Sequence, residues 1–256
     1  MDAHWINSGI SGQGFLWNSN GEDTPYHQSA TLTEAILDYE NFKNIWWLES
    51  ALAAAKKVCR IKFPNGSATG FVVGPDHLIT NNHVFSKEVD AENAILQFDY
   101  RLRIDGSIHP IDEWQCHPEQ LFLTNPELDY TLVSVMPTNN GKKIGEARGY
   151  FNLSQNHPII GKNHRVNIIQ HPQGRFQHIA FRDNQVQHVN TQVIQYLTDT
   201  DYGSSGSPVF DDYFNVIALH SQRVPNPQSN RWYRNQGYLI SSIYTDIKNK
   251  DIDMYR

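Results

Sequence analysis

Residues 198–210 read TDTDYGSSGSPVF and place two glycines, three serines and a proline between two apolar runs. The flanking runs, residues 191–197 and 207–210, are rich in β-branched and aromatic residues, which predicts a strand on each side. Glycines and small hydroxyl residues at such a position form either a simple turn or a loop that presents a hydroxyl for chemistry. The rest of the chain decides between the two.

The strand pattern extends over most of the sequence. After Val58, about a dozen short runs rich in β-branched and aromatic residues alternate with Gly, Pro, Asn and Asp turns. These runs are residues 59–63, 68–74, 77–80, 94–100, 130–135, 165–170, 176–182, 185–189, 191–197, 207–210, 214–221 and 237–241. Because no helical pattern separates them, we expect an all-β fold of barrels or a sandwich.

The two ends of the chain have a different character. Residues 1 to about 32 are polar and show no sustained period, so we interpret residues 1–50 as an N-terminal extension. Residues 33–58 combine helix formers with apolar pairs at helical spacing and contain no Gly or Pro, which predicts one or two helices. Residues 241–250 begin with Ser and contain lysines at their end, which predicts a C-terminal helix.

Composition excludes several classes of protein. The 256 residues carry a formal net charge of -6 with both signs mixed along the chain, so no basic stripe is available for nucleic acid. No apolar run approaches the length of a membrane span, and the N-terminus lacks the features of a signal peptide. We therefore expect a cytoplasmic protein that binds neither nucleic acid nor membrane.

Cysteine and histidine spacing gives no sign of a metal site. Cys59 and Cys116 lie far apart, so we expect free thiols in a reducing compartment, with a single disulfide as the alternative. His-Pro pairs occur without Cys or His at ligand spacing, at His109, His117, His157 and His171. We expect neither a metal nor an organic cofactor.

Three short patterns place a polar residue where a β-barrel has a loop. His83 follows a strand in residues 78–85, Asp129 precedes one in residues 128–133, and Ser205 lies between glycines. A serine hydroxyl attacks a carbonyl when a neutral imidazole accepts its proton, and the imidazole needs a carboxylate to hold its tautomer. We therefore assign His83 as base, Asp129 as its orienting carboxylate and Ser205 as nucleophile. Gly203 adopts conformations closed to other residues, so the backbone N–H groups of Gly203 and Ser205 can face one oxyanion.

These patterns resemble a known family. The loop GSSGSPVF (residues 203–210) is similar to the active-site serine loop of trypsin/chymotrypsin-like peptidases, most closely to the G-x-S-G-S-P loop of the bacterial glutamyl endopeptidase branch. LITNNHVF (residues 78–85) resembles that branch's L-T-x-x-H-V motif, and LDYTLV (residues 128–133) its D-x-x-L/V motif. The resemblance covers residues 51 to 250 and leaves the extension outside.

The resemblance implies a fold and the parts of a site. It implies two antiparallel β-barrels, the first over about residues 51–145 and the second over about residues 146–242, with the active site in the cleft between them. Separations of 46 residues from His83 to Asp129 and 76 from Asp129 to Ser205 suit that arrangement. It also implies that Ser205 is the nucleophile and that Gly203 and Ser205 supply the oxyanion hole.

The substrate-binding residues implied by the resemblance favour two opposite P1 preferences. His220 falls where glutamyl endopeptidases have the histidine that receives an acidic P1 side chain, and Thr200 also matches that branch. Ser221 falls where the family has a serine near its buried aspartate. Residues 221–223 would pair with the substrate backbone as an added strand. Asp199 departs from the branch and occupies the position at which trypsin-type enzymes select Arg or Lys. The two effects leave the P1 preference open.

Activation is expected to differ from that of zymogens in the family. Those proteins pair a new N-terminal ammonium with an aspartate just before the nucleophile, and here that position is the neutral Ser204. We expect this switch to be absent and residues 1–50 to regulate, to dock onto a protein partner or to cap the barrels.

The sequence thus predicts a serine endopeptidase that hydrolyses peptide bonds of protein substrates through an acyl-enzyme. The alternative is a pseudopeptidase, a binding or scaffolding module of the same fold. A third hypothesis is a regulated bacterial effector whose extension docks onto a larger assembly.

Overall fold

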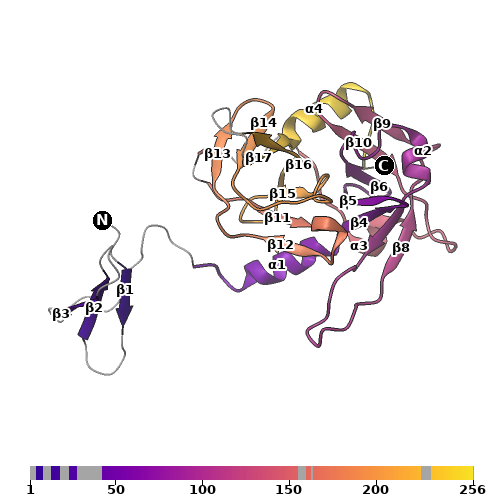
Figure 1. The fold of residues 1–256 in the computed structure, drawn as a ribbon. Helices are drawn as coiled ribbons and strands as arrows, with labels where there is room; N and C mark the ends of the chain where they lie inside the picture. Colours follow the sequence, from indigo (N-terminus) through magenta and orange to yellow (C-terminus); the bar gives the residue numbers. More distant parts are fainter. Residues whose placement is uncertain are drawn as a thin grey trace. The chain divides into compact units, whose positions relative to one another are not determined.

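The computed structural model describes residues 42–154, 160–162, 164–225 and 232–255, and three strands nearer the N-terminus. The chain divides into two compact units, Met1–Asn44 and Ile45–Arg256. In the first unit, β1 (His4–Asn7), β2 (Gln13–Trp17) and β3 (Asp23–His27) form an antiparallel sheet (Figure 1). These strands lie within the expected extension and were not predicted, because strands of four or five residues are too short to show a sustained period in sequence.

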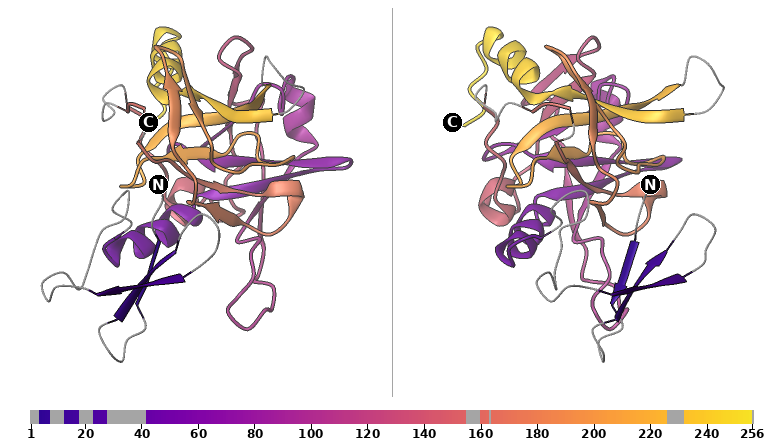
Figure 2. Two further views of the ribbon diagram at one scale, coloured as in Figure 1. Left: turned by 60° about the vertical axis from the view of Figure 1, so that its left-hand side comes forward. Right: turned by 90° about the vertical axis from the view of Figure 1, so that its left-hand side faces the viewer.

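The second unit consists of two seven-stranded antiparallel sheets, which confirms the predicted all-β architecture (Figures 1 and 2). The first sheet has the order β8-β7-β4-β5-β6-β10-β9 and the second the order β12-β11-β15-β16-β17-β14-β13. The strands of the first sheet are β4 (Val58–Phe63), β5 (Gly66–Val72), β6 (His77–Thr80), β7 (Ile95–Phe98), β8 (Asp112–Gln115), β9 (Phe122–Asn125) and β10 (Tyr130–Ser134). Those of the second are β11 (Asn167–Gln170), β12 (His178–Ala180), β13 (Val186–Val189), β14 (Val193–Tyr196), β15 (Pro208–Phe210), β16 (Val216–Pro225) and β17 (Trp232–Leu239).

Each of the twelve predicted runs overlaps an observed strand, but two strands of the second unit, β8 and β9, were not predicted. Three of the four residues of β8 and two of the four residues of β9 are polar, so neither has the apolar content of a typical strand. Short helices also occur between strands, where none was expected: α2 (Glu88–Glu92), α3 (Ile144–Arg148) and the single 3-10 turn η1 (Pro172–Gly174). One turn of helix is too brief to give a helical period.

A helix opens the second unit. α1 (Trp46–Ala55) lies inside the predicted helical stretch, of which residues 33–41 fall outside the described part of the chain. Trp47 is buried against the rings of Phe181 and Phe214, whose centroids lie 5.8 and 5.1 Å away. Trp46 instead remains 41% exposed beside Tyr213, so only one of the paired tryptophans anchors the helix.

The predicted C-terminal helix is confirmed as α4 (Ile240–Asn249), which packs against β16 and β17 (Figure 2). Ile240, Ile243 and Ile247 recur at helical spacing and are fully buried. The expected serine cap is not present, because the helix begins at Ile240 and Ser241 already lies inside it. In the part of the chain that the structure describes, no helix is long and apolar enough to cross a membrane.

Each sheet encloses its own apolar cluster, and a third cluster lies where the two sheets meet. The shared cluster includes Phe71 from the first sheet, Phe210 from the second, and Phe151 between them, with ring centroids 5.9 and 5.3 Å apart. Cys59 and Cys116 are both buried free thiols in the cluster of the first sheet, as the sequence predicted. Burial raises the pKa of Cys116 to about 12 and that of Cys59 well above its usual value.

Buried histidine also joins the two sheets. His171 follows β11 and is fully buried; its backbone N–H donates to Oγ1 of Thr69 on β5 at 3.1 Å. Its Nδ1 lies 3.1 Å from the carbonyl of Arg175, whereas its buried Nε2 has no hydrogen-bond partner. Burial lowers the pKa of His171 to about 4, so the ring is neutral at pH 7.

This buried imidazole predicts a loss of stability in mild acid. An unfolded histidine binds a proton below about pH 6.5, whereas folded His171 does so only below about pH 4, so stability is complete above 6.5 and falls as the pH drops toward 4. Between pH 7 and pH 5 the contribution amounts to about 2 kcal/mol. The free energy of unfolding, measured with urea, is expected to decrease from pH 7 to pH 5. This decrease should be about 2 kcal/mol smaller in His171→Leu, because leucine cannot titrate.

His188→Gln is the matched control, because His188 is exposed. It should retain the wild-type pH dependence. An unchanged pH dependence in His171→Leu would contradict the assignment.

Candidate active site

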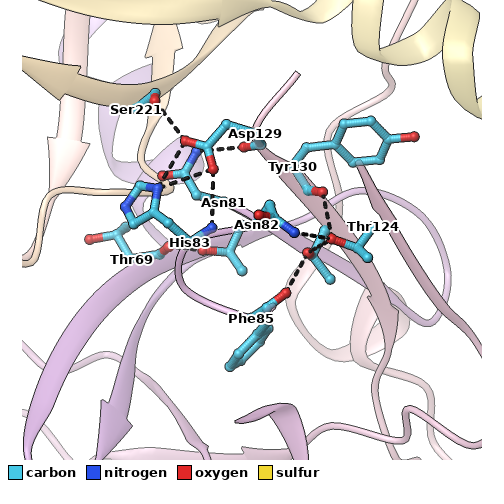
Figure 3. Close-up of polar contacts among 11 residues, drawn as sticks. Thr69, Asn81, Asn82, His83, Phe85, Thr124, Asp129, Tyr130 and Ser221 are labelled. Carbon is cyan, nitrogen blue, oxygen red and sulfur yellow. Dashed lines mark hydrogen bonds and ion pairs between the residues drawn. The ribbon is translucent and has the colours of Figure 1, made fainter. Parts of the chain in front are cut away.

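Two antiparallel strands bring His83 and Asp129 together. β6 and β10 pair so that Thr80 lies opposite Thr131, and the end of β6 therefore meets the start of β10 at one edge of the sheet. His83 follows β6 by three residues, and Asp129 directly precedes β10. His83 Nδ1 lies 2.9 Å from Asp129 Oδ2 and 3.1 Å from Oδ1. The two side chains face each other in Figure 3.

The carboxylate of Asp129 is surrounded by hydrogen-bond donors. The backbone N–H of His83 donates to Oδ1 at 3.1 Å, and the hydroxyl of Ser221 donates to Oδ2 at 2.6 Å. Asn81 Nδ2 donates to the Asp129 backbone carbonyl at 2.9 Å and helps hold the residue at a φ of 44° (Figure 3). Since an ionised carboxylate only accepts hydrogen bonds, it fixes the proton of a neutral His83 on Nδ1 and leaves Nε2 as the basic nitrogen.

Exposure differs between the two partners. The Asp129 side chain is 13% exposed, whereas that of His83 is 48% exposed. The carboxylate is thus shielded from water while the imidazole can be reached from outside. This division suits a base that exchanges protons with a bound molecule.

Ser205 lies on a loop held between the two sheets. On one side, the Thr69 N–H donates to the Ser205 carbonyl at 2.9 Å; on the other, the Gly206 N–H donates to the His220 carbonyl at 3.0 Å. Thr69 also accepts a hydrogen bond on its carbonyl from Thr80 Oγ1 at 2.8 Å, three residues before His83. The loops that carry Ser205 and His83 therefore meet on one residue of β5. Within the described residues, however, the Ser205 hydroxyl makes no hydrogen bond with His83 or any other group.

Two glycines allow this loop to approach the strand so closely. At Gly203, with a φ of 87°, a Cβ would lie 2.6 Å from the His171 carbonyl; at Gly206, with a φ of 82°, it would lie 2.1 Å from that of Thr69. Neither position can hold a side chain without rearrangement. In the described part of the chain, no group accepts from the N–H of Gly203 or of Ser205. Two unpaired N–H groups beside a hydroxyl are what an oxyanion hole requires.

His220 and Ser221 point to different partners from adjacent positions on β16. Ser221 binds Asp129, as described, whereas buried His220 contacts the hydroxyl of Tyr196 through Nδ1 at 2.7 Å. Burial, and secondarily the charges of His83 and Arg223, lower the pKa of His220 to about 3. The ring is therefore neutral at pH 7 and offers hydrogen bonds rather than a positive charge.

The remaining substrate residues of the sequence analysis share a cavity of about 480 Å³. Its lining consists of Leu197, Asp199, Thr200, Asp201, Arg223, Arg234 and Asn235, and does not include His220. The hydroxyl of Thr200 is buried without a hydrogen-bond partner. Asp199 is exposed, so water screens the attraction of its carboxylate for a cation.

Sequence reasoning missed several residues that shape the site. Thr69, Asn81 and Gln173 hold the two loops through backbone and side-chain hydrogen bonds. Asn81 lies inside the quoted histidine motif, but nothing in its spacing shows that its amide reaches a carbonyl 48 residues away. Among the described residues, no group of three or more His, Cys, Asp and Glu side chains is placed to hold a metal ion.

Known proteins are similar to this chain in sequence and in fold. An uncharacterized protein, y4fB, of Sinorhizobium fredii is 31% identical over 209 residues, covering 75% of this chain and 32% of the relative. A glutamyl endopeptidase of Staphylococcus aureus is 28% identical over 170 residues, covering 65% of this chain and 50% of the relative. The chain thus spans between a third and a half of the length of these relatives.

A solved structure of a Glu endopeptidase in complex with MPD shares the fold, with a TM-score of 0.56 at 16% identity, covering 77% of this chain and 90% of that one. The family model of the trypsin-like peptidase domain matches residues 68–219, a stretch that runs from β5 through the His83–Asp129 pair to the serine loop and β16. With more than half of its length inside that match, the chain belongs to the trypsin-like peptidase family.

Proposed function

We propose that this chain is a serine endopeptidase in which Ser205 is the nucleophile, His83 the general base and Asp129 its orienting carboxylate. The observation that carries the proposal is the His83–Asp129–Ser221 hydrogen-bond network beside a glycine-bracketed serine loop with two unpaired N–H groups. The family match and the shared fold support the same reaction class. The alternative, a pseudopeptidase, would have no need of that whole arrangement.

The reaction proceeds by acyl transfer. Ser205 Oγ attacks the scissile carbonyl carbon while its proton passes to His83 Nε2, and the carbonyl electron pair moves to oxygen, facing the N–H groups of Gly203 and Ser205. His83 then gives its proton to the leaving amine as the carbon–nitrogen bond breaks. A water molecule, deprotonated by His83, resolves the acyl-enzyme by the same steps. Asp129 stabilises the imidazolium that forms twice in each turnover.

We further propose a preference for an acidic P1 side chain. In the cavity beside the serine loop, Arg223 pairs with Asp201 at 2.8 Å, and Asp199 is exposed to water. Arg234, which also donates to Gln195 Oε1 at 3.2 Å, lines the same cavity as the buried Thr200 hydroxyl, and the two groups would receive the carboxylate as hydrogen-bond donors. The name of the Staphylococcus aureus relative, a glutamyl endopeptidase, agrees with this preference.

Residues 1–44, which form a unit of their own, are proposed to regulate the peptidase or to dock it onto a protein partner. The role as a bacterial effector and the cytoplasmic location stay predictions. Because α1 belongs to the second unit and buries Trp47, a truncation that tests the extension has to end before Ile45.

Covalent labelling tests the nucleophile. A fluorophosphonate probe, which needs an activated serine, is expected to modify the wild-type chain at Ser205, and Ser205→Ala is expected to lose the label completely. Mass spectrometry of the modified peptide identifies the site. A chain that lacks residues 1–44 is labelled in parallel: faster labelling than in the full chain would assign an inhibitory role to the extension. A folded wild type that stays unlabelled with and without residues 1–44 would favour the pseudopeptidase.

Removal of the carboxylate charge tests the His83–Asp129 pair. Asp129→Asn is expected to lower kcat/KM by about 10³ to 10⁴, because the amide no longer fixes the productive tautomer or stabilises the imidazolium. Ser221→Ala, which removes one hydrogen bond to the carboxylate, is expected to lower kcat by about tenfold or less. Steady-state kinetics on one peptide substrate measure both, and an Asp129→Asn enzyme with wild-type kcat/KM would refute the role of Asp129.

A P1 substrate library tests the specificity. Cleavage after Glu is expected to exceed cleavage after Lys or Arg, and Arg234→Ala is expected to reduce kcat/KM for a Glu substrate by about tenfold through the lost charge-assisted hydrogen bond. The matched control is the isosteric Gln substrate, for which the same variant should change kcat/KM by less than about threefold. Preferred cleavage after Lys or Arg would instead assign selectivity to Asp199.

A further inference from the structure

Each of the two N–H groups proposed for the oxyanion hole is oriented by a hydrogen bond to the carbonyl of its own peptide unit. A trans peptide is planar, and its C=O and N–H point in opposite directions. The carbonyl of Ser204 accepts hydrogen bonds from the N–H and the hydroxyl of buried Ser207, at 3.0 and 2.6 Å. It therefore faces the interior, and the N–H of Ser205 in the same peptide faces the opposite way.

The other N–H depends on a separate loop. The carbonyl of Tyr202 accepts a hydrogen bond from the backbone N–H of Gln173 in η1. This contact turns the N–H of Gly203, in the same peptide, away from η1. The orientation of this half of the proposed oxyanion hole thus depends on the position of Gln173.

Gln173 is itself fixed by a side-chain network. Its Nε2 donates to Asp201 Oδ2 at 2.7 Å, and Asp201 Oδ1 accepts from the Tyr202 N–H and from Arg223 Nη2, both at 2.8 Å. The Tyr202 N–H and Gln173, with Arg223 adding less, hold the pKa of Asp201 below its usual range, so the carboxylate is ionised at pH 7. Arg223 also donates to the Thr200 carbonyl at 3.4 Å.

The backbone of Gln173 has an unfavourable conformation. Gln173 has a φ of 55°, a conformation that costs free energy for a residue with a side chain and persists where its surroundings enforce it. On the other side of the contact, Gly203 can adopt many φ values, so the Tyr202–Gly203 peptide can rotate when it is not restrained. A rotated peptide would present its carbonyl, rather than its N–H, to a developing oxyanion.

We propose that Gln173, Asp201 and Arg223 form a clamp of positioning residues that keeps the Gly203 N–H turned into the oxyanion hole. The clamp runs from η1 through the serine loop to β16, whose residues 221–223 are the expected pairing edge for the substrate. Strand pairing of a substrate and the geometry of the oxyanion hole are therefore connected through Arg223. This inference rests on the proposed peptidase function.

The test compares two ligands of one sequence. A peptide aldehyde, on attack by Ser205 Oγ, forms a hemiacetal whose oxygen occupies the oxyanion hole, whereas the corresponding peptide alcohol binds the same subsites and forms no adduct. Asp201→Ala and Gln173→Ala are expected to weaken inhibition by the aldehyde about tenfold or more and by the alcohol less than about twofold. kcat should fall with little change in KM.

Arg234→Ala is the matched control. It removes a cation from the same cavity, and the hydrogen bond that it breaks is the one from the guanidinium to Gln195 Oε1 at 3.2 Å, on β14. In this variant, aldehyde and alcohol are expected to weaken together, so that their ratio stays constant. Melting temperatures show whether each variant is folded.

The outcomes separate the clamp from the peptidase function. If the wild type reacts with the fluorophosphonate but the aldehyde-to-alcohol ratio in folded Asp201→Ala and Gln173→Ala stays within about twofold of the wild type, the clamp is overturned and the peptidase stands. If both variants weaken both ligands equally, the three residues serve substrate binding alone and the clamp is again overturned. A folded wild type that does not react, either with or without residues 1–44, overturns the proposed function.

Discussion

The structure of the site depends on the hydrogen bonds of one threonine. Thr69, fully buried on β5, donates its N–H to Ser205 and its hydroxyl to Gly203, and accepts from Thr80 and from the N–H of His171. The N–H and the hydroxyl of Thr69 thus join the two sheets, whereas its carbonyl binds Thr80 on the neighbouring strand β6 of the same sheet. Because buried backbone groups have to be paired, the serine loop, the strand before His83 and the end of β11 are held in one relative position.

The histidines around this junction differ in how deeply they are buried. The ionisable pair at the centre consists of half-exposed His83 and shielded Asp129, while the neighbouring His171 and His220 are neutral because burial lowers their pKa values to about 4 and 3. Neutral buried histidines supply directional hydrogen bonds to carbonyl and hydroxyl groups without adding a competing positive charge.

The two peptides of the proposed oxyanion hole are oriented by contacts of different range. Ser207, within the serine loop, orients one N–H through contacts four residues or fewer away. The other N–H is oriented from η1, about thirty residues earlier in the chain, by a backbone contact that the Asp201 side chain supports. One half of the hole is thus local and rigid, whereas the other requires that distant loops dock correctly.

The sequence by itself determined the all-β class, the C-terminal helix and the three loops with His83, Asp129 and Ser205, because strand composition, glycine-bracketed turns and motif residues are local properties. The resemblance to the peptidase family implied the two-barrel arrangement and a place for Ser221 near the buried aspartate. Only the tertiary structure decided that Asp199 is exposed and that Gln173 and Thr69 hold the serine loop through hydrogen bonds. These contacts join residues up to 134 positions apart, and their formation depends on strand register and backbone conformations such as the positive φ of Gln173. No local sequence pattern encodes contacts over such separations in sequence. The residue types of the site therefore follow from the sequence, whereas their relative positions depend on tertiary packing.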